Sequence, residues 1–372
     1  METKRVSIHL EGINTRDALP PTEKTAECLK DAGELLKKGE IVAFPTETVY
    51  GLGANALNGA ACQKIYAVKG RPADNPLIVH IASLAEVTGI VRVWPQKAEI
   101  CARQFWPGPL TIVLPKKDII PDIVSGGLDT VAVRMPSHPV ALALIQAAGC
   151  PLAAPSANLS GKPSPTLAEH VWQDLNGKIP LLIDGGPCTV GLESTVLDLT
   201  GEIPVILRPG GITREQLEAV LGRVDLDCHS GNDQPKSPGM KYRHYAPEGD
   251  VVLIHGSIPE KVEKISHLLC KKEDGKKIGL LCLKNTAALM PMDILSRADT
   301  LFILGSEEDL TLAAGRLYEG LRYCDKHKVD MILAEEISEE GIGLAFMNRL
   351  RKAAGKKNMS DPAKILSRPD QD

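Results

Sequence analysis

The chain has 372 residues, more than one typical domain holds, so two domains are expected. Its net charge of −4 and its aromatic content of 3% argue against a protein that coats nucleic acid, because such binding needs excess cations and stacking rings. Residues 1–10 lack the apolar core of a signal peptide, and no run of about 18 apolar residues predicts a membrane span, so we expect a cytoplasmic protein. The nine cysteines occur singly and not at zinc-binding spacing, which predicts reduced thiols.

Residues 1–222 are predicted to form the first domain. After a lead-in strand, strands are predicted at 40–44, 77–82, 110–115, 130–135, 181–183, 194–199 and 204–208, and helices at 25–38, 60–68, 139–148 and 213–221. Residues 45–53 are expected to form a turn, and Thr213 and Gln216 to form a capping box at the start of the last helix. Because the strands cluster and do not alternate strictly with helices, the pattern predicts an α/β domain with a twisted, mixed sheet.

Polar and Pro-rich sequence at 223–249 predicts a linker, which at this length tends to be functional or disordered. Beyond it, 250–357 is predicted to be a second domain, with strands at 251–255, 278–283, 300–304 and 330–334 and helices at 258–271, 310–324 and 343–355. This regular alternation predicts a smaller Rossmann-like α/β domain, but without a Gly-x-Gly-x-x-Gly motif no dinucleotide site is predicted there. Residues 358–372 are expected to form a tail.

A loop with two cations is the most informative segment of the chain. The predicted helix 60–68 ends at Lys69-Gly70, and Pro72 cannot continue it. Lys69, Arg71 and Asn75 are therefore expected on a stiffened loop that is suited to holding a polyanion. The alternative is a surface turn with solvated charges.

A second polar loop follows the short apolar run that starts at Pro151. Ser156, Asn158 and Ser164 offer compact donors and acceptors that suit phosphate oxygens or the edge of an adenine base. Ordinary turn chemistry is the alternative, and it is the favoured one if this segment is considered alone.

Together with the segment Phe44-Pro45-Thr46-Glu47-Thr48-Val49-Tyr50-Gly51-Leu52-Gly53, these two loops resemble the YrdC-type domain. The Lys241-Tyr242-Arg243-His244-Tyr245 segment and the second domain extend the resemblance, over 26–357, to the two-domain threonylcarbamoyl-AMP synthases. The resemblance implies a twisted mixed sheet with a concave basin, followed by the smaller Rossmann-like domain. It also implies a reaction of L-threonine, bicarbonate and ATP that yields threonylcarbamoyl-AMP and pyrophosphate. The product would serve the N6-threonylcarbamoyladenosine modification of tRNA at position 37, through a downstream threonylcarbamoyl transferase complex.

The resemblance also implies site residues. Lys69 and Arg71 are the catalytic candidates. The ATP-binding candidates are Arg71, Asn75, Thr130, Ser156, Asn158, Ser164, Arg208 and Tyr242, with His244 or Tyr245 as alternatives to Tyr242. The threonine-binding candidates are Thr48, His80, Arg134, Ala154 and Ser194. Mg²⁺ is expected to arrive with ATP, since no cluster of carboxylates indicates a metal site in the protein.

The residues themselves support parts of this assignment. Thr130 and Arg134 are four apart on one predicted strand, which puts both on one face of it. The alternative for His80 is an ordinary buried strand histidine. No nucleophile motif occurs, so the chemistry is expected to depend on positioning and charge stabilisation.

Two other functions stay open. One is an RNA-binding or ribosome-assembly module with a basic basin, which would make at least weak RNA contact. The other is a hydrogenase-maturation protein, because YrdC-type domains also occur there. The absence of a Cys-x-x-Cys series disfavours that second alternative.

Overall fold

The computed structural model describes residues 2–8, 23–227 and 245–355. The chain divides into two compact units, one of residues 1–160 and 164–242 and one of residues 161–163 and 243–372. The predicted domain boundaries at 222 and 250 stay predictions. Residues 228–244 of the predicted linker and the predicted tail at 358–372 lie outside the described residues.

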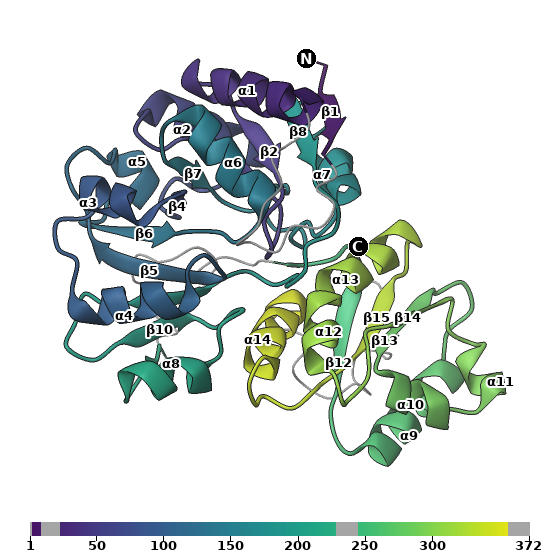
Figure 1. Cartoon of the computed structure of the whole chain (residues 1–372). Coiled ribbons are helices and arrows are strands. Elements are labelled where there is room, and N and C mark those ends of the chain that lie inside the picture. Colours follow the sequence, from purple (N-terminus) through teal and green to yellow (C-terminus); the bar gives the residue numbers. More distant parts are fainter. Residues whose placement is uncertain (1, 9–22, 228–244, 356–372) are drawn as a thin grey trace. The chain divides into compact units, whose positions relative to one another are not determined.

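The first unit is built on a mixed sheet (Figure 1), as the sequence predicts. Its described strands run in the order β1-β8-β2-β3-β7-β4-β6-β5-β9-β10-β11, with both parallel and antiparallel neighbours. The strands are β1 (Lys4–Ser7), β2 (Val42–Phe44), β3 (Gly51–Asn55), β4 (Ile78–His80), β5 (Leu110–Pro115), β6 (Thr130–Arg134), β7 (Leu152–Ala154), β8 (Leu181–Asp184), β9 (Thr195–Asp198), β10 (Val205–Arg208) and β11 (Asp225–Leu226). The last of these lies inside the segment predicted to be a linker without secondary structure.

The helices of this unit include every one that the sequence predicts. They are α1 (Glu23–Lys37), α2 (Gly59–Lys69), α3 (Val87–Ile90), α4 (Gln96–Phe105), α5 (Asp122–Ser125), α6 (Pro139–Ala148), α7 (Ala168–Leu175) and α8 (Arg214–Leu221). A capping box of Thr213 and Gln216 begins α8, as predicted. The helices α3, α4, α5 and α7 are additions to the predicted set.

The turn predicted at 45–53 is partly wrong, because its second half forms strand β3. Glycine is depleted in strands, so Gly51 and Gly53 hide this strand in the sequence. Phe44 on the neighbouring strand favours glycine at both positions: a Cβ at Gly53 would clash with the Phe44 ring at 2.8 Å, and one at Gly51 would make a tight contact with it at 3.2 Å.

The large sheet is covered on both faces. On one face, Val42 and Phe44 of β2 belong to a core that includes α1 and α6. On the opposite face, Ala43 belongs to a larger core that includes residues of α2, α4, α7 and α8. This alternation is the period of two that a strand imposes on its side chains.

Strands β4, β6, β5 and β9 carry a small apolar cluster of Ile78, Val113, Ala132 and Val196. His80 follows Ile78 by two residues, and Arg134 follows Ala132 by two residues, so both point to the face of this cluster. The sheet thereby gathers polar site candidates from separate strands on one face.

Tight packing of α1 on α6 gives a first testable prediction. A Cβ added at Gly33 of α1 would lie 2.7 Å from backbone atoms of Ala147 in α6. Gly33→Ala is therefore expected to lower the free energy of unfolding by about 1–3 kcal/mol through overpacking. This effect opposes the gain of about 1 kcal/mol that alanine brings to a helix.

Urea unfolding of the purified variant measures this effect. Gly89→Ala in α3 is the matched control, because a Cβ there meets no atom within 4 Å. The control should be neutral or more stable than the wild type. A Gly33→Ala protein as stable as the Gly89→Ala protein would contradict the prediction.

The second unit contains a four-stranded, all-parallel sheet with the order β12-β15-β13-β14 among the described residues. Its strands are β12 (Asp250–Ile254), β13 (Ile278–Cys282), β14 (Thr300–Ile303) and β15 (Met331–Glu335). Its helices are α9 (Ile258–Cys270), α10 (Lys284–Leu289), α11 (Met292–Leu295), α12 (Leu310–Gly315), α13 (Leu317–Lys326) and α14 (Gly343–Ala354). Helices α9 to α11 lie on one side of the sheet and α12 to α14 on the other (Figure 1), which confirms the predicted smaller α/β domain.

A buried carboxylate lies at the end of strand β15 in this second sheet. Glu335 is 1% exposed and accepts hydrogen bonds from Lys261 Nζ at 2.9 Å, Thr286 Oγ1 at 2.8 Å and the Leu283 amide at 2.8 Å. Three donors thus satisfy this carboxylate, as is usual for a buried charge. Across the described parts of both units, no helix combines the length and apolarity needed to cross a membrane.

Candidate active site

The cationic loop and the Ser-Ala-Asn loop meet through Lys69. This residue ends α2, where Gly70 adopts φ 62° and so turns the chain out of the helix. The Lys69 side chain is buried, and its Nζ donates to the carbonyl oxygens of Ser156, at 2.5 Å, and of Asn158. Asn158 Oδ1 lies 3.5 Å from the same Nζ. The lysine ammonium therefore fixes the backbone of a loop that is nearly 90 residues away in the sequence.

Arg71 and Asn75 are held inside the cationic loop. Arg71 donates from Nε to the Asn75 carbonyl at 3.1 Å and from Nη2 to the Pro76 carbonyl at 2.9 Å. Tyr66 of α2 also donates to the Asn75 carbonyl, at 3.1 Å. Asn75 itself is 1% exposed, and its Oδ1 has no hydrogen-bond partner among the described residues. These contacts give the loop one defined shape.

The three polar side chains of the second loop fall into two groups. Ser156 Oγ donates to Asn158 Oδ1 at 2.6 Å, so these two form one unit beside Lys69. Ser164 Oγ donates to Glu193 Oε1 at 2.6 Å. Ser164 is thereby tied to the segment that leads into β9.

Arg134 is the centre of the predicted threonine-binding group. Its side chain is buried at the end of β6, where Nη1 donates to Thr48 Oγ1 at 2.9 Å and Nε donates to the Gly108 carbonyl at 3.3 Å. Its Nη2 lies 2.6 Å from Glu47 Oε1. His80 is the residue opposite Arg134 in the pairing of β4 with β6.

Ser194 joins this group through β5. Thr111 lies opposite Arg134 in the pairing of β5 with β6, and its hydroxyl is 2.7 Å from Ser194 Oγ. Arg208, a predicted ATP-binding residue, donates from Nη2 to the Ser194 carbonyl at 2.9 Å and to Ser194 Oγ at 3.2 Å. The structure thus brings Arg208 to the predicted threonine-binding residues.

The predicted residues occupy two ends of the same strands. Thr130 begins β6 and Arg134 ends it, so they are four residues, or about 13 Å, apart. Ala154 pairs with Ile78 at the beginning of β4, and the loop with Ser156 and Asn158 follows directly. Arg71, Asn75, Thr130, Ser156 and Asn158 therefore belong to one end, and His80, Arg134, Ser194 and Arg208 to the other.

One predicted contact lies outside the described residues, namely Tyr242, together with its alternative His244. The other alternative, Tyr245, belongs to the second unit, where its ring centroid is 5.2 Å from that of Tyr318. Which of the three contacts a nucleotide stays a prediction.

Sequence reasoning missed three buried polar residues at the site: Glu47, Thr111 and Glu193. Glu47 stands in the Thr-Glu-Thr segment, of which only Thr48 is a predicted site residue. Thr111 is a hydroxyl in the otherwise apolar strand 110–115, a signal that was available in the sequence. Glu193 precedes Ser194 directly, but no sequence pattern links it to Ser164.

His80 is neutral in the folded protein. Burial and the neighbouring Arg134 charge lower the pKa of His80 to about 3, from an ordinary value of 6.5. Its Nδ1 lies 3.1 Å from the Ile78 carbonyl, which orients the neutral ring. His80 is therefore suited to hydrogen bonding and not to carrying a positive charge at neutral pH.

This lowered pKa predicts how stability depends on pH. In the unfolded state His80 binds a proton below pH 6.5, whereas in the folded state it does so only near pH 3. The free energy of unfolding is therefore highest above pH 6.5 and falls as the pH drops from 6.5 toward 3. At pH 5 the expected loss is about 2 kcal/mol. In His80→Gln, the free energy of unfolding by urea should fall by about 2 kcal/mol less between pH 7 and pH 5 than in the wild type. An identical pH dependence in both proteins would contradict the prediction.

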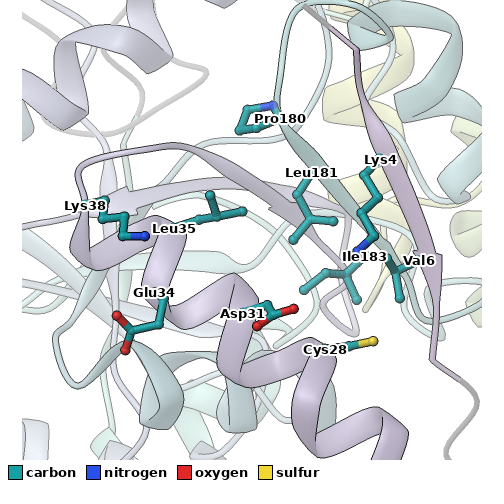
Figure 2. Close-up of a pocket in the computed structure, with 10 residues that line it drawn as sticks. All are labelled: Lys4, Val6, Cys28, Asp31, Glu34, Leu35, Lys38, Pro180, Leu181 and Ile183. Atoms are coloured by element: carbon teal, nitrogen blue, oxygen red, sulfur yellow. The ribbon is translucent and has the colours of Figure 1, made fainter.

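A pocket of about 320 Å³ lies elsewhere on the first unit (Figure 2). Its lining comes from α1, with Cys28, Asp31 and Glu34, and from β1 and β8, with Lys4 and Leu181. None of the predicted site residues lines it. This pocket is therefore separate from the candidate active site.

Comparisons with known proteins identify the family of this chain. A family model described as telomere recombination matches residues 34–210, and a model described as threonylcarbamoyl-AMP synthase, C-terminal domain, matches residues 212–355. The chain is 49% identical over 331 residues to the threonylcarbamoyl-AMP synthase of Pyrococcus abyssi, which covers 88% of this chain and 94% of that protein. It is 50% identical over 331 residues to the threonylcarbamoyl-AMP synthase of Bacillus subtilis, covering 88% of this chain and 93% of that protein.

A solved structure supports the same relationship. The crystal structure of P. abyssi Sua5 complexed with L-threonine matches with a TM-score of 0.85 and 46% sequence identity, covering 94% of this chain and 97% of that one. The match includes both the mixed-sheet unit and the smaller unit, since the shared length is nearly the whole of each chain. The chain therefore belongs to the family of two-domain threonylcarbamoyl-AMP synthases.

Proposed function

We propose that this chain is an L-threonylcarbamoyladenylate synthase, a nucleotidyltransferase that joins L-threonine, bicarbonate and ATP. The observation that carries the proposal is the buried Arg134 guanidinium, which donates to Thr48 at one end of the strands. The two loops that Lys69 joins lie at the other end of the same strands. Family membership supports it, as does the L-threonine complex of the P. abyssi protein.

The threonine end offers a cation and hydroxyl groups. A buried guanidinium is well suited to a substrate carboxylate, because its planar fork can donate two parallel hydrogen bonds. Thr48, Ser194 and neutral His80 offer hydrogen bonds for the remaining polar groups of threonine. The Ala154 backbone, which lies opposite Ile78 at the beginning of β4, is proposed to add another from the side of the nucleotide end. These roles stay proposals.

The nucleotide end is proposed to use the two loops joined by Lys69. Arg71 offers its guanidinium, and Asn75, Ser156 and Asn158 offer neutral donors and acceptors, to the phosphates and the base. Thr130 lies at the same end. Ser164 and Arg208 lie toward the residues around Ser194 and are proposed to contact the part of ATP that approaches threonine.

Mg²⁺ is proposed to arrive bound to the ATP phosphates. The described residues include no group of three or more His, Cys, Asp and Glu side chains that could hold a metal ion. The nucleotide end is lined by cations and neutral groups, which fit phosphate oxygens and not a metal ion. When bound, Mg²⁺ would offset the negative charge of the triphosphate.

The proposed chemistry has two steps. In the first, the threonine ammonium group loses a proton, the neutral nitrogen forms a bond to the carbon of bicarbonate, and a water molecule leaves, which gives the carbamate. In the second, a carbamate oxygen attacks the α-phosphorus of ATP, and pyrophosphate leaves with the electron pair of the broken P–O bond. The protein contributes orientation at both ends of the strands and cations beside the developing charge.

Pyrophosphate release by the purified protein tests the proposal. Release from ATP should require both L-threonine and bicarbonate, and leaving out either should reduce it to the background of the protein-free mixture. Pyrophosphate release that does not depend on threonine, or no release under any condition, would contradict the proposal. Transfer of the product to a threonylcarbamoyl transferase for tRNA modification, any RNA contact and a cytoplasmic location stay predictions.

A further inference from the structure

Glu47 is a buried carboxylate with few partners. It lies in the turn between β2 and β3 and is 5% exposed. Neither of its carboxylate oxygens has a hydrogen-bond donor among the described residues, and the close contact of Oε1 is the ion pair with Arg134 Nη2 at 2.6 Å. Arg134 Nη2 likewise has no hydrogen-bond partner there. The two charges are adjacent without being aligned for a hydrogen bond.

A second buried carboxylate in the same chain shows what is unusual here. Glu335, in the second unit, accepts three hydrogen bonds. A buried charge normally gathers such donors, because losing water without replacing its hydrogen bonds is costly. Glu47 therefore has acceptor capacity that a ligand with several N–H donors would use.

The groups around Glu47 leave it as the local negative charge. The hydroxyl groups of Thr46 and Thr48 are bonded to each other, and Thr48 also accepts from Arg134. Burial lowers the pKa of His138 and raises the pKa of the Cys188 thiol, so neither carries a charge near neutral pH. A cationic ligand group would find its counter-charge in Glu47.

We propose that Glu47 binds the ammonium group of the amino-acid substrate, while Arg134 binds its carboxylate. This inference rests on the proposed function and adds a specificity-determining residue to its threonine end. An α-amino acid carries its two opposite charges on groups attached to the same carbon, which matches a buried cation and anion 2.6 Å apart. On binding, each protein charge exchanges its partner for the opposite charge of the substrate, so no buried charge is left uncompensated.

The proposal has a consequence for substrate choice. A site that binds an ammonium group through a buried carboxylate rejects an analogue without that group, because the carboxylate would be left unpaired. 3-Hydroxybutyrate has the hydroxyl and carboxylate groups of threonine but no amine. It should compete poorly with threonine in the wild-type protein, at a dissociation constant at least about tenfold higher.

Calorimetric titration of the full chain with each ligand tests the assignment. Glu47→Gln should weaken threonine binding at least about tenfold. It should leave 3-hydroxybutyrate binding unchanged or stronger, because the carboxylate that competes for Arg134 is gone. Glu193→Gln is the matched control: it changes another buried carboxylate of the site, bonded to Ser164, and should not change the ratio of the two affinities.

Equal weakening of both ligands by Glu47→Gln would mean that Glu47 only holds Arg134 in place, and would overturn the proposal. Unchanged threonine binding would overturn it as well. If Glu47→Gln does not fold, Glu47→Asp keeps the charge and withdraws it by one methylene, and the same selective loss is expected. A wild-type protein that neither binds threonine nor releases pyrophosphate would instead defeat the proposed function, so the two failures are distinguishable.

Discussion

Replacing Lys69 by methionine is expected to lower the rate of pyrophosphate release at least about 100-fold, because misplacing catalytic groups by an ångström costs that much. The variant keeps the length of the side chain but removes the ammonium that donates to the Ser156 and Asn158 carbonyls. Each buried carbonyl left without a donor costs about 1–3 kcal/mol, so the loop is expected to shift. Because this loop belongs to the proposed nucleotide end, the KM for ATP should rise more than the KM for threonine.

Steady-state kinetics with each substrate varied in turn measures this effect. Lys64→Met is the matched control on the same helix, since Lys64 forms an exposed ion pair with Glu40 and lies outside the site. The control should retain wild-type activity within about twofold. Near-normal turnover by Lys69→Met would contradict the role assigned to Lys69.

Replacing Arg134 by methionine is expected to affect both stability and binding. The variant leaves the Glu47 carboxylate buried without its ion-pair partner, and removing one member of a buried pair typically costs about 3–5 kcal/mol. Threonine binding should become undetectable by calorimetry, because the variant lacks the cation that is proposed to bind the threonine carboxylate. The double variant Arg134→Met, Glu47→Leu should recover much of the stability but none of the binding.

Urea unfolding and threonine titration of the same preparations measure the two effects. Arg214→Met is the control, because Arg214 pairs with Glu218 on the exposed surface of α8, where such pairs contribute less than about 1 kcal/mol. A stable Arg134→Met protein that binds threonine normally would show that the pair with Glu47 is neither structural nor part of the site.

Much of the fold follows from local sequence signals. The helix at 139–148 and the strand at 110–115 were predicted with the bounds that α6 and β5 have, because apolar runs are bordered there by proline and glycine. Strand β3 was not predicted, since its two glycines are explained by Phe44 on another strand. Such a reason lies in tertiary packing, which a local pattern does not record.

The sequence predicts the candidate site as a set of residues but not as an arrangement. The sequence indicates that Lys69 and the Ser-Ala-Asn loop are polar and suited to anions. It does not reveal that the lysine ammonium donates hydrogen bonds to the backbone carbonyl oxygens of that loop. Arg208 was expected with the ATP-binding residues but contacts Ser194. Glu47 has no signal of its own in the sequence, because a glutamate in a turn is ordinarily exposed, whereas this one is buried beside Arg134.

Detection of the product by mass spectrometry tests the central claim most directly. The purified chain would be incubated with ATP, ¹⁵N-labelled L-threonine and ¹³C-labelled bicarbonate, and the mixture analysed for adenylates. The proposed function predicts threonylcarbamoyl-AMP that carries both labels, formed in proportion to pyrophosphate. An adenylate without the ¹³C label, or the absence of any threonine-containing adenylate while the protein is folded, would contradict it.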